Sequence, residues 1–250
     1  MTSQVGDTVR VRIEEVTEPA AHHEVAALFE RIWQAPVVDP STLRALAHTG
    51  NYVAGAYDGL LVGAAVGFFA ADGHLHSHVT GVAPEYQGRG LGAALKQHQR
   101  AWTLARNRTA ISWTFDPLMA RNAYFNLAKL GAVVTEYLPD FYGPIKDGIN
   151  AGDASDRLFV VWRLDRAAAP AEHDATILLD RDGDVPAPTG ARGDRLSVAT
   201  PEDIERLRNT DPALAERWRM AVREALAGAM DAGWRITGIT RDGRYLLERP

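Results

Sequence analysis

The stretch that decides the fold is residues 82–92, which read VAPEYQGRGLG. The run with β character at about residues 75–82 predicts a strand before it, and the helical spacing of apolar residues over 91–105 predicts a helix after it. Glycine permits backbone conformations and close approaches that a Cβ forbids, and a helix N-terminus offers unpaired N–H groups with partial positive charge. A strand, a glycine-rich loop and a helix in this order therefore predict a pocket for a phosphate or pyrophosphate, to which Arg89 adds a cation.

The spacing of the glycines distinguishes between the known kinds of phosphate loop. No Gly-Lys-Ser/Thr follows, as a P-loop requires, and the spacing differs from the G-x-G-x-x-G dinucleotide fingerprint. The pattern here is Gln87-x-x-Gly90-x-Gly92, preceded by V-x-P-E-Y. It resembles the acyl-CoA loop of the GCN5-related N-acetyltransferase (GNAT) superfamily, whose pattern is Q/R-x-x-G-x-G/A after a strand that ends in Val-x-Pro. The alternative is a glycine-rich turn that binds no ligand.

The resemblance implies that the cofactor is acetyl-CoA or another acyl-CoA. In the superfamily, the end of the strand before the loop offers main-chain groups to the pantetheine arm, and the N–H of Val82 is then the candidate for the thioester carbonyl. The loop itself would bind the pyrophosphate, and one residue of a later helix would reach the CoA arm. The cofactor-binding residues implied in this way are Gly81, Val82, Ala83, Gln87, Gly88, Arg89, Gly90, Leu91, Gly92 and Asn122.

Composition limits the class of protein. The chain has 250 residues, of which 46% are apolar, and a formal net charge of −5, so it can bury a sizeable core and lacks the basic excess of a nucleic-acid binder. It has no cysteine, which excludes disulfides, thiolate zinc sites and cysteine nucleophiles. The longest apolar run, residues 60–71, is too short to span a bilayer, and residues 1–12 lack the apolar core of a signal peptide. We therefore expect a cytoplasmic protein with neither nucleic-acid nor membrane partners.

Hydrophobic periodicity predicts the element order β-α-α-β-β-β-α-β-α-β-β from about residue 8 to residue 165. The expected strands cover residues 9–16, 51–57, 60–69, 74–82, 109–115, 132–141 and 157–164. This order matches the GNAT fold independently of the loop. We therefore expect an α/β (α+β) protein with the GNAT fold, in which a mixed central sheet has helices on both faces, plus a smaller C-terminal α/β element.

Three segments are expected along the chain. Residues 1–165 would be the acyl-CoA-binding GNAT domain, and 166–191 a linker that could include a short strand at 176–179. Residues 192–250 would be a β-α-α-β-β subdomain packed on the first, because a helix there carries a long apolar face. The same element order opens the chain, so a degenerate half-repeat is an alternative interpretation of this subdomain.

The strand before the loop reads His74-Leu75-His76-Ser77-His78, and a period of two places its three histidines on one face. As a metal site the histidines lack an adjacent acidic or fourth ligand, so we expect no metal. A second interpretation is that they are structural. His78 lies six residues before Pro84, where many GNAT enzymes place a glutamate base, so the resemblance implies His78 as the general base, with His76 or Asp116 orienting it.

The sequence departs from the superfamily at the general acid. Many GNAT enzymes have a tyrosine four residues before the glycine of Leu-Gly-Phe that protonates the thiolate, and Leu127 stands at that position. Tyr124 or Tyr142 could replace it, or the thiolate could leave unassisted. Candidates for the acceptor pocket lie near the same end of the sheet, although Asp116 also fits the N-cap of the next helix. These candidates are Trp113, Asp116, Tyr142, Asp156 and Arg157.

These features predict an acyl-CoA-dependent N-acyltransferase that moves an acetyl or other acyl group from CoA to an amine of a small molecule or protein. Direct attack in a ternary complex is expected, because no cysteine is available as a nucleophile. Two alternatives remain open. One is a non-catalytic acyl-CoA-binding sensor, which the missing tyrosine suggests, and the other is an interaction protein whose C-terminal part forms a homodimer or a lid.

Overall fold

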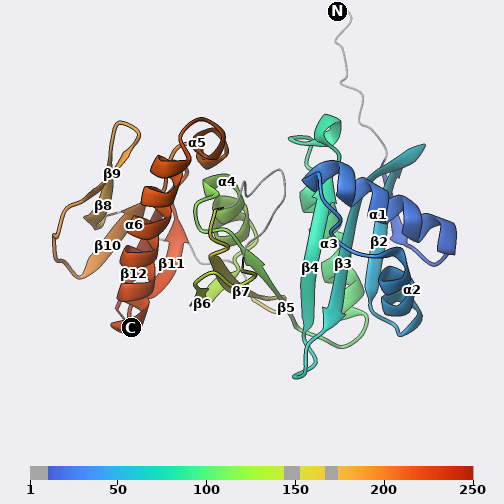
Figure 1. Cartoon of the computed structure of the whole chain (residues 1–250). Helices are drawn as coiled ribbons and strands as arrows, with labels where there is room; N and C mark the ends of the chain where they lie inside the picture. The colour runs from blue at the N-terminus through green and yellow to red at the C-terminus, as the bar shows by residue number, and fades with distance from the viewer. Residues whose placement is uncertain (1–10, 144–152, 167–173, 250) are drawn as a thin grey trace, which may run out of the picture. The chain divides into compact units, whose positions relative to one another are not determined.

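The computed structural model describes residues 11–143, 153–166 and 174–249 (Figure 1). The chain forms two compact units, Met1–Arg108 and Thr109–Pro250. This division lies within the segment that we expected to be a single domain, and the domain boundaries near residues 165 and 191 stay predictions. The described residues form a mixed α/β fold, as the sequence predicted.

The first unit is an antiparallel sheet with helices, in the order that the sequence predicted. Its strands pair in chain order from β1 to β4, and the hairpin between β2 and β3 turns at Gly59, whose φ is 71°. Its elements are β1 (Arg12–Glu15), α1 (Pro19–Trp33), α2 (Pro40–His48), β2 (Tyr52–Asp58), β3 (Leu60–Phe69), β4 (Leu75–Val82), a 3₁₀ turn (Pro84–Tyr86) and α3 (Leu91–Leu104).

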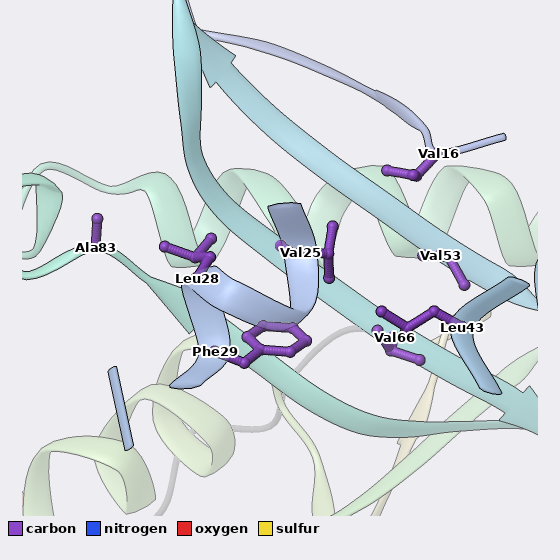
Figure 2. Close-up of a cluster of buried hydrophobic side chains, with 9 residues drawn as sticks. Val16, Val25, Leu28, Phe29, Leu43, Val53, Val66 and Ala83 are labelled. Carbon is purple, nitrogen blue, oxygen red and sulfur yellow. The ribbon is translucent and has the colours of Figure 1, made fainter. Parts of the chain in front are cut away.

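Helices cover both faces of this sheet, which explains why β2 and β3 are apolar throughout. Val53 of β2 packs in a buried cluster with residues of α1 and α2, among them Leu28 (Figure 2). Its neighbour Tyr52 points to the other face. There its ring lies 5.1 Å from that of Trp102 on α3, and its hydroxyl is 2.8 Å from Nδ1 of His98. Each large apolar side chain buried in this way contributes about 1.5–3 kcal/mol to stability.

A β-bulge interrupts β4 next to its histidines. Ser77 pairs with Gly67 and Val79 with Val66, so His78 is an extra residue with no partner on β3. Val79 packs against the α1–α2 cluster, whereas the hydroxyl of Ser77 bonds to α3 on the other face. The bulge therefore changes the alternation of β4, a feature that the sequence pattern did not predict.

The second unit contains two sheets, and the first of them continues the predicted element order. β7 lies between β5 and β6, and both pairings are antiparallel. The helix predicted to begin at Asp116-Pro117 is a short α-helix followed by a π-helical segment. The elements are β5 (Ala110–Phe115), α4 (Ala120–Ala123), the π-helical segment (Tyr124–Lys129), β6 (Val133–Leu138) and β7 (Arg157–Arg163).

The second sheet of this unit has the strand order β11-β12-β10-β8-β9, with β8 and β10 parallel. Its elements are β8 (Thr176–Asp182), β9 (Val185–Pro188), β10 (Arg195–Ala199), α5 (Ile204–Thr210), α6 (Pro212–Asp231), β11 (Arg235–Ile239) and β12 (Arg244–Glu248). The segment 166–191, expected to be a linker with a possible short strand at 176–179, contains β8 and β9. The Asp182-Gly183 pair is a hairpin turn between them, with a φ of 57° at Gly183, and not a break between domains.

The strand pairing contradicts the alternative that the C-terminal element is a half-repeat of the start of the chain. At the start of the chain, β1 pairs with β2, the strand that follows the two helices. In the C-terminal element, β10 pairs instead with β12, the second strand after its helices. The apolar face of α6 is buried as predicted, with Trp218, Val222 and Leu226 fully inaccessible.

Candidate active site

The glycine-rich loop joins β4 to α3 and needs glycine for its backbone. Gly88 and Gly90 have φ values of 74° and 81°, in the left-handed region that other residues rarely adopt. A Cβ added at either position would meet no atom within 4 Å, so open space surrounds the main chain there. The loop therefore has both properties that the approach of a phosphate requires, which are an accessible backbone and no side chain in the way.

The N-terminus of α3 is available to a ligand. Gly90 is its N-cap residue, and no side chain caps the helix. The first N–H groups of the helix thus keep the capacity to bind an anion. The Arg89 guanidinium lies 5.4 Å from the centre of the Tyr86 ring, and the Tyr86 hydroxyl donates to Asp58 at 2.7 Å. The β2–β3 turn thereby supports the aromatic ring that positions the cation of the loop.

The end of β4 is closely covered by α1. A Cβ at Gly81 would lie 2.8 Å from Ile32 and 2.9 Å from the Trp33 ring, so only glycine fits between the strand and the helix. Ala83 is buried in the α1–α2 cluster, and Val82 accepts a hydrogen bond from the Gln87 side chain at 3.3 Å. Packing with α1 therefore fixes the strand end whose main chain was predicted to contact a cofactor.

The histidines of β4 lie beside one aromatic ring. The Phe68 ring centre is 5.2 Å from that of His76 and 5.8 Å from that of His78. Burial, together with the neighbouring His78, His74 and Lys96, lowers the pKa of His76 to about 4. Burial also lowers the pKa of His78 from 6.5, although part of its ring is exposed. Both imidazoles are therefore neutral at physiological pH, which is the form that accepts a proton.

His74 differs from the other two histidines because its Nδ1 lies within hydrogen-bonding distance of a carboxylate oxygen of Asp72 in the turn before β4. Among the residues that the structure describes, no group of three or more His, Asp or Glu side chains is arranged as a metal site.

Lys96 of α3 is a buried amine on the opposite face of β4. Its Nζ donates to the Ser77 hydroxyl at 2.9 Å and to Oε1 of Gln99 at 3.4 Å. Burial lowers the pKa of Lys96 to about 7. This amine was not among the residues that we singled out, although its helical spacing with Gln99 and Thr103 places all three on the face that packs against the sheet.

Asp116, which follows β5, belongs to a buried ion cluster with two arginines of the C-terminal helices. Arg219 binds both oxygens of Asp116, at 2.7 and 3.0 Å, and Arg208 binds the same carboxylate. Both arginines also bind Asp153, at 2.7 and 2.9 Å. Burial would raise the pKa of Asp116, but the two arginines outweigh it and hold that pKa well below its usual range.

These contacts favour a structural role for Asp116. Oδ1 also accepts from the backbone N–H of Leu118 at 2.9 Å, so the carboxylate organises the turn before α4, near the capping role that we considered. The catalytic and acceptor-binding roles of Asp116 stay predictions. Sequence reasoning missed Arg208 and Arg219 because they come from helices about a hundred residues further along the chain.

A second group of polar residues surrounds the start of β7. Asp156 accepts from Arg223 at 2.8 Å and from the Tyr137 hydroxyl at 2.6 Å. The next residue, Arg157, lies over the ring of Tyr142 at 5.4 Å from its centre. The structure thus brings three of the five predicted acceptor residues together, and Arg223 is the member that sequence reasoning missed.

The other predicted residues have mixed environments. Trp113 is buried against Trp162, with ring centres 6.4 Å apart, so it is part of the core and its role in an acceptor pocket stays a prediction. Leu127 is buried in the π-helical segment, where the superfamily's tyrosine would stand. Tyr124 lies at the start of the same segment beside Lys129, and Asn122 is exposed.

None of the described helices is both long enough and apolar enough to cross a membrane. The model of the acetyltransferase (GNAT) family matches residues 17–131. No curated protein is similar enough to count as a match.

Solved structures share the fold at low sequence identity. The protein yncA from Salmonella typhimurium, assigned as an acetyltransferase and solved with acetyl-CoA, is 20% identical with a TM-score of 0.51, and the match covers 65% of this chain and 98% of that one. The Escherichia coli ribosomal-protein alanine N-acetyltransferase is 16% identical, with a TM-score of 0.51 and coverages of 65% and 99%. An aminoglycoside 6'-N-acetyltransferase complexed with CoA is 14% identical, with a TM-score of 0.50 and coverages of 63% and 99%.

Proposed function

We propose that the protein is an N-acyltransferase that uses acetyl-CoA or a related acyl-CoA, because residues 17–131 match the model of the acetyltransferase (GNAT) family. The acceptor is an amine of a small molecule or a protein. The observation that carries this proposal is the loop of residues 87–92, with its two left-handed glycines and the uncapped N-terminus of α3.

The chain's own residues fit a CoA pyrophosphate. The N–H groups at the start of α3 and the guanidinium of Arg89 supply donors and positive charge, and the empty space beside Gly88 and Gly90 admits phosphate oxygens. The main chain of residues 81–83 would bind the pantetheine arm. A bound acyl-CoA would supply the thioester that is the acyl donor.

His78 is the proposed general base, which takes the proton that the acceptor ammonium must lose. The bulge separates His78 from the ladder with β3, and burial keeps its imidazole neutral near physiological pH. His76 lies beside the same phenylalanine and would help to orient it. Because Leu127 replaces the usual tyrosine, the thiolate would be protonated by Tyr124, Tyr142 or water.

Cofactor binding is tested at Gly90. The substitution Gly90→Val places a β-branched side chain both at a φ of 81° and in the path of the pyrophosphate, and we expect CoA affinity in calorimetry to fall by about tenfold or more. The matched control is Gly50→Val, which has the same φ of 81° and open space but lies between α2 and β2. Equal CoA affinity in the wild type and Gly90→Val would contradict the assignment of the loop.

Catalysis is tested at His78. The substitution His78→Ala should lower kcat by about 10²–10⁴-fold while CoA affinity stays unchanged. In the wild type, the rate should rise with pH through a histidine pKa below 6.5 and level off near neutrality, because the neutral imidazole is the competent form. This rise should disappear in His78→Ala, whereas His74→Ala, which removes the partner of Asp72, should change little.

An unaltered kcat and pH profile in His78→Ala would show that His78 is structural. CoA binding without release of CoA over a broad panel of amines would support the sensor function instead, which the buried Leu127 favours.

A further inference from the structure

Three arginines around the ends of β5 and β7 are neutralised by carboxylates. Arg208 and Arg219 share Asp116 and Asp153, and Arg223 binds Asp156. Arg219 and Arg223 are one helical turn apart on α6, so both reach this cluster from the same face of the helix. These guanidinium groups have the partners that buried cations require, which makes them structural.

Arg157 lies in the same cluster but has a different environment. Its Nη1 donates to the backbone carbonyl of Asp156 at 2.8 Å, and its guanidinium lies over the Tyr142 ring. Within the described part of the chain, no carboxylate forms an ion pair with it. Burial lowers the pKa of Arg157, with Asp116 opposing this effect, but an arginine remains charged.

The acidic groups near Arg157 have other hydrogen-bond partners. Asp140, on the connection after β6, accepts from the backbone N–H of Ser155 at 3.1 Å and from its hydroxyl at 3.2 Å. Asp156 turns its carboxylate to Arg223 and gives Arg157 only its carbonyl oxygen. The Arg157 guanidinium therefore keeps N–H donors for a planar anion.

The surroundings of Arg157 are suited to a ligand. Tyr142 is 43% exposed, although its hydroxyl is 3.0 Å from the Thr114 hydroxyl and its ring supports the guanidinium. Phe115 of β5 pairs with Leu158 of β7, so Arg157 lies at the end of the sheet where Asp116 follows β5. A cation stacked on a partly exposed ring can offer its edge to a carboxylate while the ring contacts apolar atoms.

We propose that Arg157, supported by the Tyr142 ring, binds a carboxylate of the acceptor, so that the preferred acceptors are amines that carry a carboxylate, as amino acids do. This inference rests on the proposed acyl transfer and names the class of its acceptor. Arginine forms two parallel hydrogen bonds to a carboxylate, and a neutral amide in its place leaves the guanidinium without an anion. Carboxylate recognition would separate such acceptors from simple amines.

The test compares matched pairs of acceptors with acetyl-CoA as donor. Each pair is an amino acid and its amide, for example phenylalanine with phenylalaninamide and β-alanine with its amide. The measured quantity is the ratio of kcat/KM for the acid to kcat/KM for the amide. Differences in intrinsic amine reactivity cancel when this ratio is compared between the wild type and variants.

We expect Arg157→Gln to lower the acid-to-amide ratio by about 10- to 100-fold, the usual worth of a hydrogen bond to a charged group. Arg157→Lys should retain part of the preference, because it keeps the charge without the planar pair of donors. The control is Arg163→Gln at the other end of β7, where the guanidinium is exposed and pairs with Asp165. An unchanged ratio in Arg157→Gln, with unchanged CoA affinity, would overturn the inference.

A second measurement separates this inference from the proposed function. The CoA-loaded protein is titrated by calorimetry with N-acetylphenylalanine and with its amide. Binding of the acid that weakens in Arg157→Gln supports the carboxylate site even if no amine is acetylated, in which case the proposed catalysis fails alone. Equal binding of the acid and amide by the wild type would overturn the inference whatever the turnover.

Discussion

Each unit of the chain contains a buried cation, and the two cations differ in the groups that surround them. In the second unit, Arg219 is surrounded by the carboxylates of Asp116 and Asp153. Burial alone would lower its pKa, but the ion pairs raise it. In the first unit, Lys96 donates to the neutral oxygens of Ser77 and Gln99, and burial lowers its pKa to about 7.

The difference shows which buried charge is structural and which can change near physiological pH. A guanidinium between two carboxylates stays charged at any pH at which the protein is folded, and it links distant segments of chain. An amine among neutral oxygens loses or gains its proton close to pH 7, beside the histidines of β4. Stability and its dependence on pH can therefore be assigned to different units.

The largest effect is expected from Arg219→Met in the second unit. It leaves the buried Asp116 and Asp153 with Arg208 alone, and removing one partner of a buried pair costs about 3–5 kcal/mol of unfolding free energy. Urea denaturation at pH 7 measures this loss, with the exposed Arg217→Met on the same helix as the control. A loss no larger than that of the control would remove the contrast between the two units.

The pH dependence of stability tests the same comparison. The arginines hold the pKa of Asp116 below its unfolded value, so its contribution to stability is complete above about pH 4 and is lost as the pH falls through the lower folded value. Arg219→Met should therefore lose less stability between neutral and acidic pH than the wild type.

The second effect is expected from Lys96→Met in the first unit. The folded pKa of Lys96 is about 7, and the unfolded value is about 10.4, so the unfolded chain binds the extra proton between these values. Lys96 should thus make stability rise with pH above 7, by up to about 1.4 kcal/mol per unit, and Lys96→Met should lack this rise. Urea denaturation between pH 7 and about pH 9.5 measures the difference. Parallel curves for the two proteins would contradict the shifted pKa, and the exposed Lys129→Met is the control.

The smallest effect is expected from Arg206→Met, which sharpens the comparison within one helix. Arg206 lies on α5 two residues before Arg208 and binds both oxygens of Asp184, at 2.8 and 2.9 Å, but both side chains are about half exposed. Water and salt screen such a pair. The denaturation midpoint of Arg206→Met should equal that of the wild type within error. A loss of unfolding free energy as large as that of Arg219→Met would mean that burial does not determine how much these ion pairs contribute to stability.

The sequence predicted what depends on neighbouring residues. The loop at residues 87–92, the hairpin at Gly59 and the apolar face of α6 are encoded within single segments, and each lies in the structure where its pattern indicated. The ion pairs of Asp116 could not be predicted in this way, because its partners Arg208 and Arg219 are 92 and 103 residues further along the chain.

The bulge in β4 and the burial of Lys96 could not be predicted for the same reason, because both depend on residues in other segments of the chain. Whether a histidine is skipped in the ladder depends on how β3 and β4 pair, and the pKa of Lys96 depends on the sheet that covers it. The hairpin of β8 and β9 was not predicted for a related reason, because an Asp-Gly pair indicates a turn equally well between two strands and between two domains.

The bulge at His78 sets the phase of the strand that contains it. Val79 faces the α1–α2 cluster, and the extra residue places Ser77 on the opposite face, towards α3. A chain shortened by deletion of His78 would close the bulge and leave Ser77 on the face of α3, because Ser77 and Val79 already pair with adjacent residues of β3 and lie on opposite faces. The imidazole of His78 could thus be removed together with its backbone while the strand on either side of it keeps its pairing with β3.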